Sequence, residues 1–333
     1  MRYLTILLGV AAALAVAGCG GDEGGGTKSA DEPVRIAVFL QVQANTYAQA
    51  QLKAVKDVAR KLNAKVTAFD GNFDTAKQTR QLQDAITSGR YDALIISPND
   101  GNALVPDIQN ALAQDLAVAC MLSPCGPEVD TLKPQIDGIS QAGTSFPNNG
   151  KAIAEGVVKA CGDKNPCNVA YLPGVSDVPY EKARLDGFMN ALKPHANIKV
   201  VARQDGQYLA DPALKATQNI LQGNSNLDVI ASSGDQMIVG AEQALEGANL
   251  EGKVALVGNG ASVLGVKAIK EGRWDSSAVY LPYTEGKVSA EYVIKKARGE
   301  ENLKTSYNMD EYSSVGVVVT KENAAKFKPE WEG

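Results

Sequence analysis

Short, almost wholly apolar runs alternate with longer segments of helical periodicity from residue 34 onward. The runs include VRIAVFL at 34–40, DALIISP at 92–98 and NVAYLP at 168–173. Runs of this kind are typical of strands buried on both faces, as in parallel sheets. Between 52 and 62, apolar residues recur at spacings of three and four, which predicts an amphipathic helix. The alternation as a whole predicts an α/β fold with parallel sheets.

The number of predicted strands indicates how the chain is divided. One sheet containing all of them would be too wide for a chain of 333 residues. We therefore predict two doubly wound parallel sheets, each in a lobe of its own. The irregular segment 123–145 lies midway between the two sets of strands, so we expect the chain to pass from one lobe to the other there.

The first 18 residues contain one charged residue, Arg2, and an apolar stretch from 4 to 17. This stretch is shorter than the ~20 residues needed to span a bilayer and matches the apolar part of a signal peptide. The letters VAGC, ending at Cys19, look like a bacterial lipobox. The pattern predicts a lipoprotein signal peptide over 1–18, lipid attachment at Cys19, and an exported protein anchored to the cell membrane by lipid only. Residues 19–33 are typical of a flexible tether. An ordinary signal peptide with a chance cysteine is the alternative.

The other four cysteines form two closely spaced pairs, Cys120 with Cys125 and Cys161 with Cys167. In an exported protein such pairs favour two disulfide bonds, with a metal site or catalytic thiols as alternatives. His195 is the single histidine, so a multi-histidine zinc site is excluded and we predict no metal site. His195 could act as a lone general base, but no nucleophile lies near it in the sequence.

Polar side chains follow the predicted strands, in segments such as FLQVQANTY, IISPND, ASSGD and LVGNG. In parallel sheets, ligands bind beyond these carboxyl ends. Amides, hydroxyls and flat rings suit an uncharged, hydroxylated ligand. The formal net charge of −5 and the lack of a basic block argue against nucleic acid. The stretch GNGASVLG has Val263 where a dinucleotide fingerprint needs glycine, so no cofactor is predicted.

At these strand ends, the sequence resembles the ribose- and galactose-type periplasmic sugar-binding proteins, the type I solute-binding proteins of ABC importers. Matching motifs include YDALIISPNDGNAL, EKARLDGFMNAL and GDQMIVGAEQAL. The resemblance implies two lobes joined by a three-segment hinge, with crossings near 144, 281 and 310. The N-terminal lobe would comprise 34–143 plus 282–309, and the C-terminal lobe 144–281 plus 310–333. Ligand would bind between the lobes as they close.

The resemblance also implies a set of ligand-binding residues. Asn45 matches an asparagine that contacts ligand, Tyr47 and Tyr208 match opposing aromatic walls, and Arg184 matches an arginine that reaches sugar oxygens. The full set is Gln41, Asn45, Tyr47, Ser97, Asn99, Arg184, Tyr208, Asp235, Asn259 and Tyr280. The alternatives are that Arg184 is a solvated helix charge and that the two tyrosines are packing residues.

Two positions depart from the family pattern. Leu122 and Ser123 stand where an Asp-Arg pair is common, and Asn259-Gly260 stands where an aspartate is expected. Both changes remove carboxylates that grip sugar hydroxyls, so ribose and simple hexoses are disfavoured. Glycine at 260, and also at 234, is expected to leave room for a bulkier or less hydroxylated ligand.

Together these features predict a monomeric solute-binding lipoprotein, without catalytic activity, that delivers a small carbohydrate or polyol to the permease subunits of an ABC importer. Three alternatives remain open. The same fold could bind a nucleoside or another non-sugar solute, it could serve a chemoreceptor or sensor kinase, or the chain could be an exported α/β enzyme.

Overall fold

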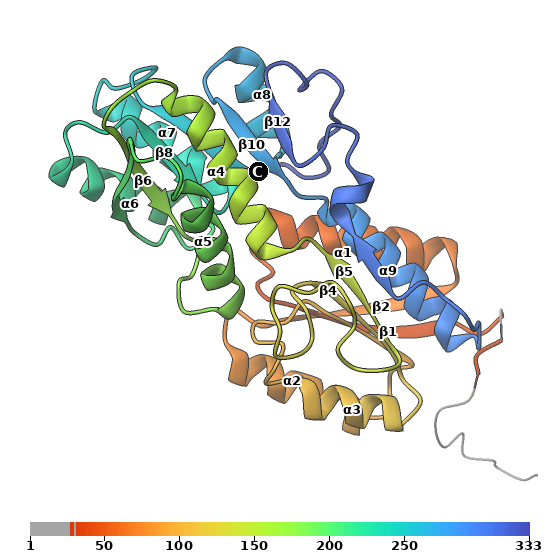
Figure 1. Cartoon of the computed structure of the whole chain (residues 1–333). Helices are drawn as coiled ribbons and strands as arrows, with labels where there is room; N and C mark the ends of the chain where they lie inside the picture. The colour runs from red at the N-terminus through yellow and green to blue at the C-terminus, as the bar shows by residue number, and fades with distance from the viewer. Residues whose placement is uncertain (1–26, 30) are drawn as a thin grey trace, which may run out of the picture.

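The computed structural model describes residues 27–29 and 31–333. The predicted signal peptide, Cys19 and most of the predicted tether lie outside the described residues. The described chain forms two α/β lobes, each built on a six-stranded sheet (Figure 1). We call the lobe that contains the first strand the N-terminal lobe and the other the C-terminal lobe. Within the described part, no helix has the length and apolar character needed to cross a membrane.

The sheet of the N-terminal lobe has the order β11-β5-β4-β3-β1-β2, and its pairings are parallel. Its strands are β1 (Val34–Leu40), β2 (Ala64–Asp70), β3 (Ala93–Ile96), β4 (Ala117–Leu122), β5 (Ile139–Gly143) and β11 (Ser306–Asn308). Helices α1 (Thr46–Lys61) and α9 (Pro282–Ala297) cover one face, and α2 (Thr75–Thr87) and α3 (Val105–Ala113) cover the other. The central strands are buried on both faces, as their apolar runs predict.

The sheet of the C-terminal lobe has the order β12-β10-β9-β8-β6-β7. Its strands are β6 (Cys167–Leu172), β7 (Ile198–Arg203), β8 (Val229–Ser232), β9 (Ala255–Gly260), β10 (Ser276–Val279) and β12 (Val318–Thr320). Helices α4 (Phe146–Cys161) and α5 (Pro179–Leu192) cover one face, and α6 (Ala210–Gly223), α7 (Asp235–Gly247) and α8 (Val263–Glu271) cover the other.

Three connections join the lobes: β5 to α4, β10 to α9, and the short 3-10 helix η1 (Met309–Tyr312) to β12. The predicted fold of two parallel-sheet lobes is confirmed, with one difference. Strand β12 is antiparallel to β10. The chain returns to this sheet directly from η1 without a crossover helix, and a parallel pairing would need such a crossover.

Local sequence signals begin the helices that flank the site. The Asn45 side chain caps α1 by accepting a hydrogen bond from the backbone N–H of Tyr47, and Asp74 caps α2 in the same way through Lys77. These caps are placed where β1 and β2 end, so the first turns of both helices lie at the carboxyl edge of the sheet.

Both predicted disulfide bonds are present in the structure. Cys120 in β4 pairs with Cys125 in the following loop, and Cys161 at the end of α4 pairs with Cys167 at the start of β6. The second bond closes the turn between a helix and the strand it covers.

Candidate functional site

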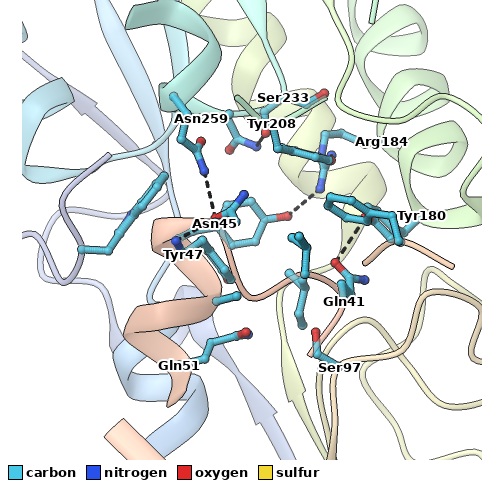
Figure 2. Close-up of a pocket in the computed structure, with 18 residues that line it drawn as sticks. Gln41, Asn45, Tyr47, Gln51, Ser97, Tyr180, Arg184, Tyr208, Ser233 and Asn259 are labelled. Carbon is cyan, nitrogen blue, oxygen red and sulfur yellow. Dashed lines mark hydrogen bonds between the residues drawn. The ribbon is translucent and has the colours of Figure 1, made fainter. Parts of the chain in front are cut away.

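A pocket lies between the carboxyl ends of the two sheets and encloses about 530 Å³ of empty space, counting the part open to solvent. In Figure 2, Gln41, Gln51 and Ser97 reach the pocket from the N-terminal lobe, and Arg184, Ser233 and Asn259 face them from the C-terminal lobe. The predicted residues that line the pocket are Gln41, Asn45, Tyr47, Ser97, Arg184, Tyr208, Asn259 and Tyr280.

Arg184 is the centre of the wall formed by the C-terminal lobe. Its guanidinium Nη1 donates to Glu181 Oε2 at 2.7 Å and to the Tyr208 hydroxyl at 2.8 Å. Nε donates to Asn149 Oδ1 at 2.8 Å, and Nη2 donates to the Tyr280 hydroxyl at 3.2 Å. Arg184 is only 2% exposed, so its interpretation as a solvated helix charge is wrong. Its charge is compensated inside the protein by Glu181, one helical turn earlier.

The Glu181 carboxylate has further partners in this wall. Its two oxygens accept hydrogen bonds from the hydroxyls of Tyr208 and Ser233, besides the bond from Arg184. Glu181 is 1% exposed. A buried carboxylate with a cation and two hydroxyl donors has the partners that burial of a charge requires.

In the N-terminal lobe, the pocket wall is built from amides. Asn45 Oδ1 accepts from the backbone N–H of Tyr47 at 2.7 Å and from Gln236 Nε2 at 3.1 Å. Gln41 Nε2 donates to the carbonyl of Pro98 at 2.7 Å, and Gln41 Oε1 accepts from the Tyr180 hydroxyl at 3.3 Å. The bonds from Gln236 and Tyr180 join the two lobes across the pocket, so the lobes are in contact in this structure (Figure 2).

Behind this amide wall lies a second buried carboxyl group, Glu285, near the start of α9. Its Oε2 accepts from the Tyr47 hydroxyl at 3.0 Å and from Gln51 Nε2 at 2.8 Å. Burial raises the pKa of Glu285 to about 8, and this effect exceeds the lowering by its two hydrogen bonds. At neutral pH this carboxyl group therefore carries a proton and adds no charge to the site.

Aromatic rings complete the pocket. The Tyr47 ring meets Tyr280 at a centroid distance of 5.7 Å and Trp331 at 5.5 Å, both edge to face. Phe73 stacks against Tyr208 across the lobes, with centroids 6.2 Å apart. Phe73 and Trp331 were not among the residues expected at the site. Phe73 has a local signal, because it directly precedes the cap of α2 at the carboxyl edge, whereas Trp331 is brought in from distant sequence.

Two predicted ligand residues lie outside the pocket lining. Asn99 is buried, and its backbone N–H donates to Gln78 Oε1 at 2.9 Å. The Asp235 carboxylate accepts from Ser262 Oγ at 2.8 Å and from Ser277 Oγ at 2.7 Å. Asp235 thus ties α7 to the neighbouring α8 and β10 inside the C-terminal lobe, and these bonds satisfy its carboxylate within that lobe.

The expected free space beside the two glycines is also filled. A Cβ atom at Gly260 would lie 2.2 Å from Trp331 Cζ2, and one at Gly234 would lie 2.8 Å from Gln236 Oε1 and 3.2 Å from Tyr208. The expectation that these glycines leave room for a bulkier ligand is therefore wrong. Side chains from elsewhere in the chain occupy the space.

The described residues contain no group of three or more His, Cys, Asp or Glu side chains placed to hold a metal ion. The pocket presents amides, hydroxyls and ring faces around an ion pair whose charges neutralise each other. Such an arrangement can bind an uncharged polar molecule by hydrogen bonds and ring contacts.

Comparison with known proteins places the chain among solute receptors. The sequence profile described as "Periplasmic binding protein domain" matches residues 36–301. The chain is 32% identical to the D-xylose-binding periplasmic protein of Escherichia coli (strain K12), over 73% of this chain and 72% of that protein. It is 26% identical to the ribose import binding protein of Bacillus subtilis (strain 168), over 76% of this chain and 78% of that protein.

Solved structures agree in fold. The periplasmic solute binding protein of an ABC transporter from Actinobacillus succinogenes 130z, with bound D-allose, superposes with a TM-score of 0.75 at 25% identity and covers 88% of this chain and all of its own. The myo-inositol binding protein of Caulobacter gives a TM-score of 0.75 at 22% identity, covering 89% of this chain and 96% of its own. Since the profile match spans most of the sequence and both lobes, the chain belongs to the periplasmic binding protein family.

Proposed function

We propose that this protein is the solute-binding subunit of an ABC importer and that it binds a small carbohydrate or polyol between its lobes. The observation that carries the proposal is the internal neutralisation of the pocket. Glu181 compensates Arg184, and burial keeps Glu285 protonated. A charged solute would find no free counter-ion among these three groups, whereas neutral hydroxyl groups can use the remaining amides and hydroxyls.

Specific groups are available for such a solute. Gln236 Oε1 is buried and has no hydrogen-bond partner within the described structure. It is therefore an acceptor ready for a solute hydroxyl, since an unpaired buried oxygen costs free energy until it is satisfied. Asn45 and Gln41 add amide groups, and Tyr47 adds an aromatic ring for the C–H surface of a sugar.

The relatives support the class of ligand. Proteins named for D-xylose and ribose match most of the chain, and a structural neighbour at 25% identity holds D-allose. We extend this ligand class to the present chain. In our proposal, closure of the lobes traps the solute, opening releases it unchanged to the permease subunits, and the protein acts as a monomer tethered by lipid at Cys19.

A nucleoside, or another neutral solute with fewer hydroxyls, is the second candidate. It is favoured by Leu122 and Asn259, which line the pocket where the family resemblance leads one to expect charged residues. Both candidates use the same pocket and differ in the number of hydroxyl groups that the solute presents.

A thermal-shift screen of the protein lacking residues 1–26 separates the candidates. The panel contains D-ribose, D-xylose, D-allose, myo-inositol, adenosine and the charged sugar acid D-xylonate. A solute at ~100 times its Kd adds about 2.7 kcal/mol to the free energy of unfolding. We expect a neutral sugar or polyol to raise the melting temperature and D-xylonate to have no effect. A shift by D-xylonate alone would contradict the proposal, and a shift by adenosine alone would select the second candidate.

A matched pair of glutamine variants tests the pocket itself. Gln41→Ala removes a lining amide that contacts Tyr180 across the lobes, whereas Gln43 is exposed two residues away. We expect Gln41→Ala to weaken solute binding at least tenfold by calorimetry and Gln43→Ala to leave it unchanged. Chromatography of the released solute should recover it unaltered, and its conversion to a product would reject a purely binding function.

A further inference from the structure

Residues 327–333, which we call the strap, run along the boundary between the two lobes, where the chain end is marked in Figure 1. Phe327 packs in the core of the C-terminal lobe. The Glu330 carboxylate accepts from the backbone N–H of Thr284, at 2.9 Å, and from the Thr284 hydroxyl, at 2.5 Å, in α9 of the N-terminal lobe. The carbonyl of Gly333 accepts from Thr46 Oγ1 at 3.0 Å, at the start of α1. The strap therefore contacts the N-terminal lobe at two places.

Between these two places, the strap is bonded to the C-terminal lobe. The carbonyl of Trp331 accepts from the backbone N–H of Val263 at 2.8 Å, and that of Glu332 accepts from Leu264 at 3.0 Å. These N–H groups begin α8 and have no acceptor within their own helix. The indole Nε1 of Trp331 donates to the carbonyl of Gly260 at 2.9 Å. These six hydrogen bonds between the strap and the two lobes thus fix the ring of Trp331 where the lobes meet.

The indole of Trp331 forms part of the pocket wall. It is 4% exposed, lines the pocket and meets the Tyr47 ring edge to face at 5.5 Å. Only glycine permits this placement at residue 260, because a Cβ there would lie 2.2 Å from Trp331 Cζ2 and the φ of +137° is itself unfavourable for other residues. Gly260 and Trp331 therefore act as a fitted pair across about seventy residues of sequence.

We infer that Trp331 is a specificity-determining residue of the solute site: its indole closes the pocket beside Tyr47, packs against the C–H surface of the solute and limits the size of solute that fits. The inference rests on the proposed function. The bonds that hold the indole and its backbone come from the C-terminal lobe, so Trp331 is carried by that lobe and meets Tyr47 of the N-terminal lobe when the lobes are together.

Tryptophan fluorescence tests this placement without altering Trp331. The chain has two tryptophans, and Trp274 lies in the core of the C-terminal lobe, outside the pocket lining. Trp274→Phe leaves Trp331 as the single indole, and Trp331→Phe leaves Trp274. Each variant is titrated with D-ribose, D-xylose, D-allose and myo-inositol. We expect the emission of the first variant to follow a binding curve whose Kd equals the Kd measured by calorimetry. We expect the emission of the second to stay constant.

Affinity measurements on two variants test the role in selection. Trp331→Ala should weaken binding of the preferred solute at least tenfold and raise the ratio of affinities for six-carbon D-allose over five-carbon D-xylose at least threefold. Trp331→Phe retains an aromatic ring, so its loss of binding affinity should be smaller than that of Trp331→Ala. Circular dichroism and the melting temperature establish whether each variant is folded. If Trp331→Ala does not fold, the inference is tested by the affinities of Trp331→Phe and by the fluorescence of Trp274→Phe.

The outcomes separate the inference from the function on which it rests. If the intact protein binds a sugar or polyol but Trp331 emission does not change, and the folded Trp331 variants bind within twofold of it with the same selectivity, the inference is wrong and the proposed function stands. If the intact protein binds none of the sugars or polyols, both are wrong.

Discussion

Each lobe places one buried glutamate beside the pocket, and the two are neutralised by different means. Glu181 in the C-terminal lobe is ion-paired with Arg184 at 2.7 Å. Glu285 in the N-terminal lobe contacts only the neutral Tyr47 and Gln51 among its described hydrogen-bond partners, and burial raises its pKa to about 8. A counter-ion therefore removes the charge on one side and a proton removes it on the other, so both walls face the solute without net charge.

The largest effect is expected where the ion pair is broken. Arg184→Met leaves Glu181 buried without a cation, which costs about 3–5 kcal/mol of unfolding free energy. Urea denaturation measures the loss. Glu181→Gln in the same chain should recover at least half of it, because the uncompensated charge is then gone.

An exposed pair serves as the control for this break. Lys159 and Glu322 lie 2.9 Å apart at 60% and 68% side-chain exposure. Lys159→Ala should produce no measurable change in the free energy of unfolding, since exposed ion pairs contribute little to stability. If Arg184→Met reduced the free energy of unfolding no more than Lys159→Ala does, the stability of the C-terminal wall would not depend on its ion pair.

The second effect concerns pH and distinguishes the two walls directly. Glu285 is faced by Tyr47 and Gln51 of α1 and by Glu330 of the strap. Its ordinary pKa of 4.5 applies to the unfolded chain, and about 8 applies to the folded protein. The folded state therefore binds more protons between these values. The stabilisation by Glu285 is complete below pH 4.5 and is lost as the pH rises through 8.

Glu285→Gln keeps the shape of the group and removes its titration. We expect this variant to match the original protein at pH 5 and to exceed it at pH 8 by on the order of 3 kcal/mol. Urea denaturation across pH 5 to 8.5 gives the difference curve, with the exposed Glu300→Gln as the surface control. A flat curve for Glu285→Gln would mean that this carboxyl group is ionised and compensated like Glu181.

The smallest effects come from the same substitution in each wall. Tyr208→Phe removes a hydroxyl that bridges Arg184 and Glu181, and hydrogen bonds to charged groups contribute about 1.5–3 kcal/mol. Tyr47→Phe removes one bond to the protonated Glu285, and neutral bonds contribute about 0.5–1.5 kcal/mol. At pH 6 we expect the first loss in unfolding free energy to exceed the second. The reverse order would contradict our conclusion that Tyr208 bonds a charged pair whereas Tyr47 bonds a protonated carboxyl group.

Much of this architecture could be predicted from patterns within short stretches of sequence. Apolar runs such as Val34–Leu40 and Ala117–Leu122 predicted strands, and the polar residues after them predicted the edge where Gln41 and Asn45 now line the pocket. The spacing of the cysteines predicted both disulfide bonds. These signals are local, so one sequence is enough to read them.

The features that were missed have weak or distant signals. Strand β5, ISQAG, is fully buried but contains Ser, Gln and Gly, so its burial comes from neighbouring strands rather than from its own composition. Glu181 had a signal in its spacing of three from Arg184, which indicates a pair on one helix face. Trp331 reaches Gly260 only through tertiary folding, and nothing local in either segment indicates the other.

The assignment of α9 to the first lobe has a consequence for how the chain is made. The core formed by β1, β3, β4 and α1 also contains Ala290, Val293 and Ile294 of α9. Although translation begins with the N-terminal lobe, its hydrophobic core can therefore be completed only after α9 has been synthesised. The C-terminal lobe has its helices and all its strands but β12 by then. Both lobes are thus completed only late in synthesis, because the core of the C-terminal lobe also waits for Val319 of β12 and for Phe327. An early fragment of the nascent chain leaves apolar surface of the N-terminal lobe uncovered until α9 emerges.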